Sequence, residues 1–383
     1  MTRVQMQVQG AVEPGFEPVA DAFRDNFRER GDTGAACSVY AGGRPVVDIW
    51  AGRSERGPWQ RNTRSTVFST SKGVLTVCLL MAVERGLLDL DAPVATYWPE
   101  FAAAGKALVT VRQLLAHRAG LVAPADDLTV ADLADWHPVT RALAQQAPLW
   151  EPGTQFAYHA LTLGWLAGEV LRRATGRRPA QWLHEDIAGP LGLTMTYGAE
   201  PQAADLAPIG APLPSADPAA AEALAALQMS PLAVRAMTMG GAVDGLDLFR
   251  AANTPAFLSY ESPAANLVTT AGSLAKLYAA TVGHVDGIRL LGADIVRDAR
   301  TVQSAGPSYL GFDDGNRWGT GFMIDSPHRA MLGPGSYGHD GAGGQLAFAH
   351  LEREVAFAYV TVRPGGVPDD RAEALCRALH SCL

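Results

Sequence analysis

Four consecutive residues, Ser69-Thr70-Ser71-Lys72, have the spacing that a serine nucleophile with a lysine base requires. The apolar segment 72–85 predicts a helix that begins here, and residues three apart on a helix lie on the same side with Cβ atoms ~5–6 Å apart. The Lys72 amine can then reach the Ser69 hydroxyl and accept its proton. The helix start also offers N–H groups and the positive dipole end to an oxyanion. The structural alternative is an N-cap serine beside a solvated lysine.

The basic residues are strongly biased toward arginine. Of 31 Lys and Arg residues, 28 are Arg and three are Lys, at Lys72, Lys106 and Lys276. Arg stays charged in proteins whereas Lys can release its proton, so these lysines are candidates for acid–base chemistry. A second S-x-x-K, Ser273 to Lys276, lies inside a predicted helix that preceding threonines already cap, and we expect it to be structural.

Other catalytic and cofactor motifs are weak or missing. The segment 333–338, GPGSYG, fits G-x-G-x-x-G, but a strand rather than a helix is expected to follow it, which argues against a dinucleotide site. No serine has glycines at both −2 and +2, and no H-E-x-x-H is present. The four cysteines are scattered and are expected to be reduced thiols of the core. We therefore expect no cofactor and no metal.

Strand patterns lie at both ends of the chain and helix patterns lie between them. Segment 16–29 has the apolar spacing of an amphipathic helix, and 35–40 and 45–50 form a hairpin pattern around Gly42-Gly43. Further helices are expected at 111–116, 161–174, 180–186, 270–281 and 371–379. Further strands are expected at 318–324, 345–350 and 355–362, and a surface loop at 201–218. This order predicts an α/β (α+β) fold with an antiparallel sheet built from both termini.

The same order predicts two domains. A discontinuous sheet domain is expected at 1–68 and 256–383, and a mostly helical domain at 69–255 is inserted into it, with the active site in the cleft between them. The chain has 383 residues, 48% of them hydrophobic, which is enough to bury a large core.

Charge and segment composition exclude several partner classes. The net charge is −8 and no basic run is present, so nucleic acid and anionic lipid are not expected partners. The first residues lack the apolar core of a signal peptide, and the longest apolar run, 74–83, is far shorter than the ~20 residues that a bilayer requires. We expect a cytoplasmic monomer or small homo-oligomer that acts on a small-molecule ester.

Three segments carry a family resemblance. VFSTSKG, followed by ERGLLDLDAPVATYWPEF and VRQLLAHRAGL, resembles the class C β-lactamase and penicillin-binding-protein superfamily, most closely its esterase branch, the family VIII carboxylesterases. WEPGTQFAYHALTLGWL resembles the family's second motif, which starts at Tyr158, and YGHDGAGG resembles the strand of its third motif. The similarity covers most of the chain. It implies a class C β-lactamase-like fold and a serine hydrolase that works through an acyl-enzyme.

The second motif adds a tyrosine to the catalytic set. If Tyr158 lies close to Lys72, the ammonium favours its phenolate, so the two groups can share the proton of Ser69 and return it to the leaving alcohol. By itself, Tyr158 would more often be a packed core residue. His159, the next residue of the motif, is predicted to contact substrate.

The third motif predicts a strand whose residues border the substrate. A strand places His339 and Gly341 on one face, expected to contact substrate, and Asp340 on the other, without a catalytic role by the resemblance. The small residues that follow leave room for substrate, and the N–H of Ala342 together with that of Ser69 is the predicted oxyanion hole.

Departures from the family pattern favour an esterase. Lactamases use the lysine of K-T-G to hold a carboxylate and the asparagine of Y-x-N to bind an amide, and this chain has His339 and Ala160 there. A neutral ester needs neither contact. Alternatives are an acyltransferase of the same fold and a weak β-lactamase or D-amino peptidase. A non-catalytic binding domain remains a further hypothesis, against which the intact Ser69, Lys72 and Tyr158 argue.

Overall fold

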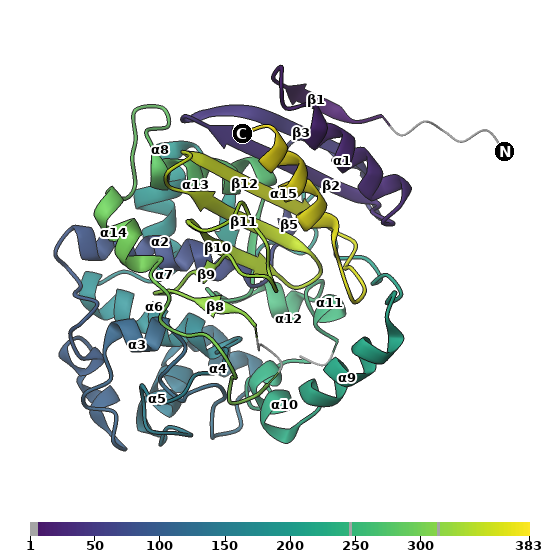
Figure 1. Ribbon diagram of the computed structural model, residues 1–383. Helices are drawn as coiled ribbons and strands as arrows, with labels where there is room; N and C mark the ends of the chain where they lie inside the picture. Colours follow the sequence, from purple (N-terminus) through teal and green to yellow (C-terminus); the bar gives the residue numbers. More distant parts are fainter. Residues whose placement is uncertain (1–6, 245–246, 312–314) are drawn as a thin grey trace.

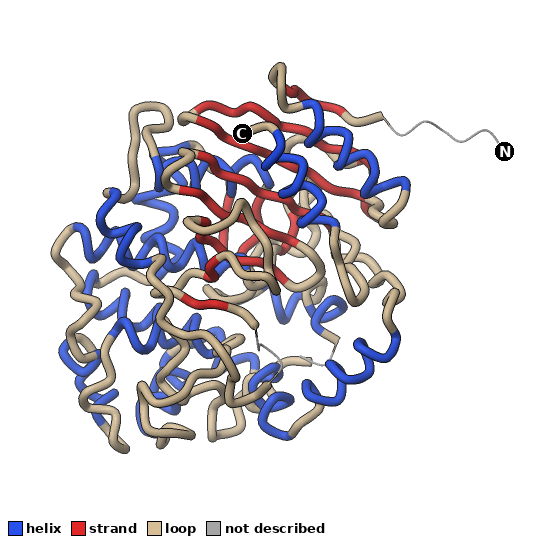
Figure 2. The backbone as a smooth tube through the Cα atoms, in the orientation of Figure 1, coloured by secondary structure: helices blue, strands red, loops and turns tan. Residues whose placement is uncertain are grey.

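The computed structural model describes residues 7–244, 247–311 and 315–383, and its centre is a nine-stranded antiparallel sheet (Figures 1 and 2). The strands follow the order β1-β3-β2-β12-β11-β10-β9-β8, with β4 paired to β3. Their bounds are β1 (Gln9–Val12), β2 (Gly34–Ala41), β3 (Arg44–Ser54), β4 (Gly57–Pro58), β8 (Arg317–Trp318), β9 (Met323–Ile324), β10 (Ser336–Gly341), β11 (Gln345–His350) and β12 (Val355–Thr361).

The two ends of the chain meet in the middle of this sheet. Strand β2 pairs with β12 in a register that runs from Ala35 opposite Thr361 to Ala41 opposite Val355. The apolar, β-branched and aromatic residues of these strands are almost all buried. The antiparallel sheet assembled from both termini is thus confirmed.

Helices cover both faces of the sheet. Helices α1 (Glu17–Arg28) and α15 (Arg371–Ser381) pack against each other on the outer face, where Figure 1 shows them in front of the strands. Helix α13 (Ala271–Val282) packs on β2, β11 and β12, and α2 (Thr70–Glu84) packs on β10. Helix α2 is apolar all round and has 13 buried residues, which is typical of a helix that other elements enclose.

The middle of the chain is mostly helical, as expected. It contributes α3 (Val111–Leu115), α4 (Val130–Asp135), α5 (His137–Gln145), α6 (Thr162–Thr175), α7 (Pro179–Trp182), α8 (Gly189–Leu191), α9 (Pro218–Gln228), α10 (Pro231–Thr238), α11 (Leu248–Ala251) and α12 (Pro255–Leu258), and α14 (Ala293–Ala299) comes later. Short 3₁₀ turns span Val94–Thr96 and Pro99–Ala102, and a π-turn spans Leu183–Ala188. In the described part of the chain, no helix combines the length and apolarity needed to cross a membrane.

A small sheet, which the sequence did not predict, ties the middle to the rest. It consists of β5 (Ser65–Thr66), β7 (Leu267–Thr269) and β6 (Met195–Tyr197). Helix α2 contacts both α6 of the helical part and β10 of the sheet. Because one core continues across the predicted boundary, the division at 68/69 and 255/256 stays a prediction.

Two local predictions need correction. Segment 318–324 is not one strand but the hairpin β8–β9, because the chain turns at Gly319 and at Gly321, which has φ +82° and lies against Thr76. The loop at 201–217 is present, but it is not purely on the surface, since Leu206 and Ile209 are buried. Segment 333–338 leads into β10, as expected, and opens no helix.

Two helical glycines allow a stability test of the packing around α2. A Cβ at Gly73 would lie 2.0 Å from the hydroxyl oxygen of buried Tyr278, whereas a Cβ at Gly272 in α13 would meet nothing closer than 3.8 Å. We expect Gly73→Ala to lower the free energy of unfolding by ~1–3 kcal/mol through overpacking. The control Gly272→Ala should be neutral or stabilise by up to ~1 kcal/mol. Urea titration measures both, and equal effects would contradict the packing described here.

Candidate active site

Ser69 lies in a strained turn between β5 and α2. It occupies the N-cap position of α2, is half-buried, and its side chain makes no capping hydrogen bond. The preceding residue, Phe68, has φ 47°, a left-handed conformation that is costly for a bulky side chain and persists only where the surroundings enforce it. The Ser69 hydroxyl is therefore not used as a helix cap.

Lys72 reaches Ser69 from inside the protein. Its side chain is fully buried, and Nζ lies 3.0 Å from Ser69 Oγ and donates to the carbonyl oxygen of Ala264 at 2.8 Å. Burial lowers the pKa of Lys72 well below its ordinary value, and Asp340 opposes that effect by its negative charge. The solvated lysine of the structural alternative is contradicted, and the lowered pKa favours the neutral form of the amine beside the hydroxyl.

Tyr158 completes a compact group with these two residues. Lys72 Nζ lies 4.8 Å from the centre of the Tyr158 ring. The ring stacks on Trp318 with centroids 5.0 Å apart and an interplanar angle of 13°, and the His117 ring also lies 5.0 Å from it. The fold thus brings together residues separated by about a quarter of the chain.

Strand β10 presents His339 to this group and Asp340 to the opposite face. The His339 ring is fully buried, 6.0 Å from that of Tyr158 and 5.5 Å from that of Trp318, and its Nδ1 lies 2.7 Å from the Asp340 carbonyl oxygen. Burial lowers the pKa of His339, so the ring is neutral at pH 7. Burial raises the pKa of Asp340, but Arg329, whose Nε is 2.9 Å away, together with His339 and Lys72 outweighs burial, and the pKa falls to about 2.

The end of β10 touches the turn that carries Ser69. A Cβ at Gly341 would lie 2.3 Å from the Val67 carbonyl oxygen and 2.9 Å from Thr70 Oγ1, so only glycine permits this approach. Within the three described ranges, neither the N–H of Ser69 nor that of Ala342 donates to a backbone carbonyl. Both N–H groups are free of backbone partners there and can bind an oxyanion.

The surroundings of His159 give no support to the substrate contact predicted for it. Its side chain is fully buried, Nε2 accepts from the N–H of Leu121 at 3.1 Å, and Nδ1 lies 2.7 Å from the Ala157 carbonyl oxygen. Burial lowers the pKa of His159 to about 4. Since both ring nitrogens are engaged by the backbone, His159 orders the loop before α6.

The side chains of the second S-x-x-K, Ser273 and Lys276, are both engaged by other parts of the fold. Ser273 Oγ accepts from the N–H of Thr194 at 3.0 Å. Lys276 Nζ donates to the Leu191 carbonyl oxygen at 2.7 Å and pairs with Asp286 at 2.7 Å. The Lys276 amine is thus held by the Asp286 carboxylate and the Leu191 carbonyl, and not by the Ser273 hydroxyl.

Three aromatic residues near the site were not assigned to it from the sequence. Trp318 and His117 pack on Tyr158, and Phe249 of α11 packs edge-on against Phe68 with centroids 5.7 Å apart. A Cβ at Gly343 would lie 3.3 Å from the Phe249 ring, so α11 borders the turn after β10. They come from separate segments, and no local pattern indicates that they meet.

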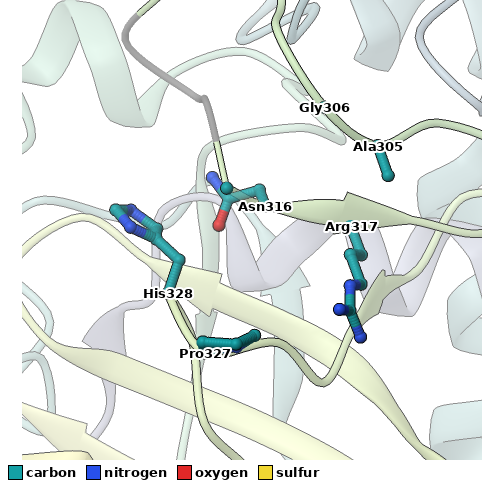
Figure 3. Close-up of a pocket in the computed structure, with 7 residues that line it drawn as sticks. Ala305, Gly306, Asn316, Arg317, Pro327 and His328 are labelled. Atoms are coloured by element: carbon teal, nitrogen blue, oxygen red, sulfur yellow. The ribbon is translucent and has the colours of Figure 1, made fainter.

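A cavity of about 590 Å³ lies beside β8 (Figure 3). Its lining includes Ala305, Gly306, Asn316, Arg317, Pro327 and His328. Successive residues of a strand face opposite sides, so Arg317 lines this cavity while Trp318 packs on Tyr158. The cavity therefore lies across β8 from the ring of Tyr158. Among the described residues, no cluster of three or more His, Cys, Asp or Glu side chains could hold a metal ion.

Comparison with known proteins defines the family. The Beta-lactamase family model matches residues 23–380. The chain belongs to the β-lactamase family. Within this family it is 35% identical over 372 residues to esterase/beta-lactamase LipL of Mycobacterium tuberculosis, covering 92% of this chain and 82% of that protein.

The crystal structure of a family VIII carboxylesterase is similar along almost its whole length, with a TM-score of 0.85, 31% identity and coverage of 98% of this chain and 100% of that one. A further relative, monacolin J acid methylbutanoyltransferase of Aspergillus terreus, is 31% identical over 174 residues, 37% of this chain and 39% of that protein. The resemblance to the esterase branch of the β-lactamase family is confirmed.

Substitution of Lys72 tests whether this residue acts as the general base. Lys72→Arg keeps a cation but cannot accept a proton, so we expect kcat for p-nitrophenyl butyrate to fall ~10²–10⁴-fold, as for Lys72→Ala. In the parent protein, kcat/KM should fall as the pH drops through the lowered pKa of Lys72, because the ammonium is no base, and should level off above it. Lys276→Arg is the control and should retain activity. A Lys72→Arg enzyme with most of its kcat would show that Lys72 acts only through its charge.

Proposed function

We propose that the protein is a serine carboxylesterase that hydrolyses small to medium neutral esters through an acyl-enzyme. The observation that carries the proposal is the 3.0 Å approach of a fully buried lysine amine to the hydroxyl of Ser69. A lysine whose pKa is lowered by burial can act as a general base at a lower pH than a lysine in water.

Acylation uses the three polar side chains in turn. Ser69 Oγ attacks the ester carbonyl carbon and its proton passes to Lys72 Nζ, while the N–H groups of Ser69 and Ala342 hold the oxyanion. Collapse of the tetrahedral intermediate breaks the bond to the alcohol, which takes a proton from Lys72 or Tyr158. Water then attacks the acyl-enzyme, gives up a proton to the same groups, and releases the acid and Ser69.

The substrate class follows from the charge of the site. His339 is neutral and Ala160 has no amide, so neither residue favours the carboxylate or the acyl amide of a β-lactam. Neutral esters are therefore the proposed substrates.

Acyl transfer is a second candidate, because a relative of this chain is named an acyltransferase. The acyl-enzyme is common to both reactions, and only the acceptor differs. The two reactions are distinguished by giving the parent protein p-nitrophenyl butyrate with increasing methanol. An acyltransferase should convert a growing share of the butyryl group to the methyl ester, whereas a hydrolase should release mostly butyric acid.

The nucleophile is tested by substitution. Ser69→Ala should abolish ester hydrolysis and labelling by a fluorophosphonate with little change in thermal stability, because the half-buried hydroxyl makes no capping hydrogen bond. Ser273→Ala is the matched control and should retain both activities. Loss of activity in Ser273→Ala but not in Ser69→Ala would identify the other S-x-x-K as catalytic. Failure of the parent protein to label would favour a non-catalytic binding domain.

The third motif is tested by selectivity. His339→Lys should improve KM for nitrocefin relative to p-nitrophenyl butyrate by a modest factor, because it adds a cation while Ala160 still lacks an amide. In the parent enzyme the same shift should occur only at acidic pH, because burial holds the pKa of His339 below its ordinary value. His339→Gln, which is uncharged, is the control. An unchanged ratio of the two kcat/KM values would place His339 outside the acyl site.

A further inference from the structure

The turn between β10 and β11 carries the N–H of Ala342 and is built almost entirely of glycine. It is closed by a hydrogen bond from the N–H of Gly344 to the Gly341 carbonyl oxygen at 3.2 Å, and Gly343 and Gly344 have φ of +90° and +104°. A glycine-rich turn has many accessible conformations in isolation. Something outside the turn must therefore select one of them.

A buried arginine contacts this turn directly. Arg371, the first residue of α15, is 1% exposed and donates from Nη2 to the carbonyl oxygen of Gly343 at 2.9 Å. The N–H of Gly365 donates to the same oxygen at 3.2 Å. This carbonyl oxygen thus accepts from two donors outside the turn.

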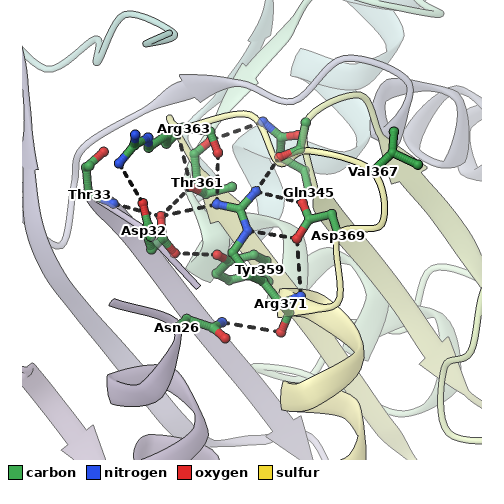
Figure 4. A network of polar contacts seen from close by, with 12 residues as sticks. Asn26, Asp32, Thr33, Gln345, Tyr359, Thr361, Arg363, Val367, Asp369 and Arg371 are labelled. Atoms are coloured by element: carbon green, nitrogen blue, oxygen red, sulfur yellow. Dashed lines mark hydrogen bonds and ion pairs between the residues drawn. The ribbon is translucent and has the colours of Figure 1, made fainter. Parts of the chain in front are cut away.

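All three nitrogens of the Arg371 guanidinium are held by hydrogen bonds. Nε and Nη2 donate to the two carboxylate oxygens of Asp369 at 2.8 and 2.7 Å, and Nη1 donates to the Arg363 carbonyl oxygen at 2.8 Å (Figure 4). A bidentate pair with a carboxylate fixes both the position and the plane of the guanidinium. A Cβ at Gly344 would lie 2.3 Å from the Asp369 carboxylate, so this pair can approach the turn only because Gly344 is glycine.

A second carboxylate, the buried Asp32, joins the two ends of the chain to this group. Asp32, which follows α1, lies 3.6 Å from Arg371 Nη1 and accepts from Thr361 Oγ1 at 2.7 Å and from the Tyr359 hydroxyl (Figure 4). The Thr361 carbonyl oxygen in turn accepts from Gln345 Nε2 at 3.0 Å. Gln345 is the first residue of β11, so the network holds both sides of the turn.

We propose that Arg371 is a positioning residue for the oxyanion hole. Held by Asp369 and Asp32, it fixes the Gly343 carbonyl and with it the turn that aims the Ala342 N–H at the reacting carbonyl. This inference rests on the proposed function, because it requires that the Ala342 N–H binds the oxyanion. Donors that are oriented before the reaction stabilise the transition state without reorganising during it, and a small displacement is costly.

The test compares two lysine substitutions at arginines that pair with a carboxylate. Arg371→Lys keeps the positive charge but loses the fork that reaches both Asp369 and Gly343. Arg172→Lys, in α6, breaks a bidentate pair with Glu169 of 2.7 and 2.8 Å that lies outside the site, and serves as the control for loss of stability. Both variants are assayed with p-nitrophenyl butyrate well below their melting temperatures.

The expected signature separates positioning from stability. Arg371→Lys should lower kcat ~10- to 100-fold with KM within ~3-fold, and should weaken a trifluoromethyl ketone inhibitor, which binds Ser69 as a tetrahedral oxyanion, by a similar factor. Arg172→Lys should change neither. Unchanged kcat and inhibitor affinity in folded Arg371→Lys would overturn the inference.

A milder variant covers the case in which Arg371→Lys does not fold. Asp369→Asn keeps Arg371 and its bond to Gly343 but removes the charge that fixes the guanidinium, so a smaller loss of kcat and inhibitor affinity is expected. Parent-like values in Asp369→Asn would overturn the inference. The proposed function is judged separately: it fails if Ser69→Ala retains activity, whereas retained activity in the Arg371 and Asp369 variants leaves it intact.

Discussion

The desolvation of Lys72 is the constraint on which the site depends. A lysine in water is charged at neutral pH and cannot remove a proton from a serine, whereas burial disfavours the ammonium form. Helix α2 supplies that burial because it is enclosed on all sides by the sheet and by α6. The Ala264 carbonyl holds the amine against Ser69, so the position and the basicity of Lys72 have the same origin in the core.

Both charged and neutral side chains surround the Lys72 amine. Asp340 is the negative charge that opposes the desolvation of Lys72, and it is itself held ionised by Arg329 on the far face of β10. His339 and His117 are kept neutral by burial, so neither adds a fixed positive charge beside Tyr158. The absence of a fixed positive charge on the two histidines agrees with the neutral esters proposed as substrates.

Close backbone approach is the second requirement, and glycine provides it. Gly341 lets β10 reach the turn before Ser69, Gly344 lets Asp369 and Arg371 reach the turn after β10, and Gly73 lets Tyr278 and β10 pack on α2. Because β2 and β12 join the chain ends in one sheet, residues as distant as Asp32 and Arg371 support the same turn. The integrity of both termini is therefore linked to the geometry of the proposed oxyanion hole.

The sequence by itself determined what local periodicity controls. The three-residue spacing of Ser69 and Lys72, the helix that carries them, the order of strands and helices, and the opposite facing of His339 and Asp340 all follow from backbone geometry over a few residues. The family resemblance added Tyr158, which no local pattern singles out from a core tyrosine. The hairpin at 317–324 was missed because its turn depends on the approach of Gly321 to Thr76, far away in the chain.

Only the tertiary structure decided between residues of the same type. Lys72 and Lys276 share a motif, yet Lys276 is paired with Asp286 while Lys72 is buried against Ser69. His159 follows Tyr158 in the motif, but its two ring nitrogens are hydrogen-bonded to backbone groups of Leu121 and Ala157. Trp318, Phe249 and Arg371 reach the site from other parts of the chain. Desolvation and hydrogen-bond partners are set by contacts between distant residues, and these contacts exist only once the chain has folded.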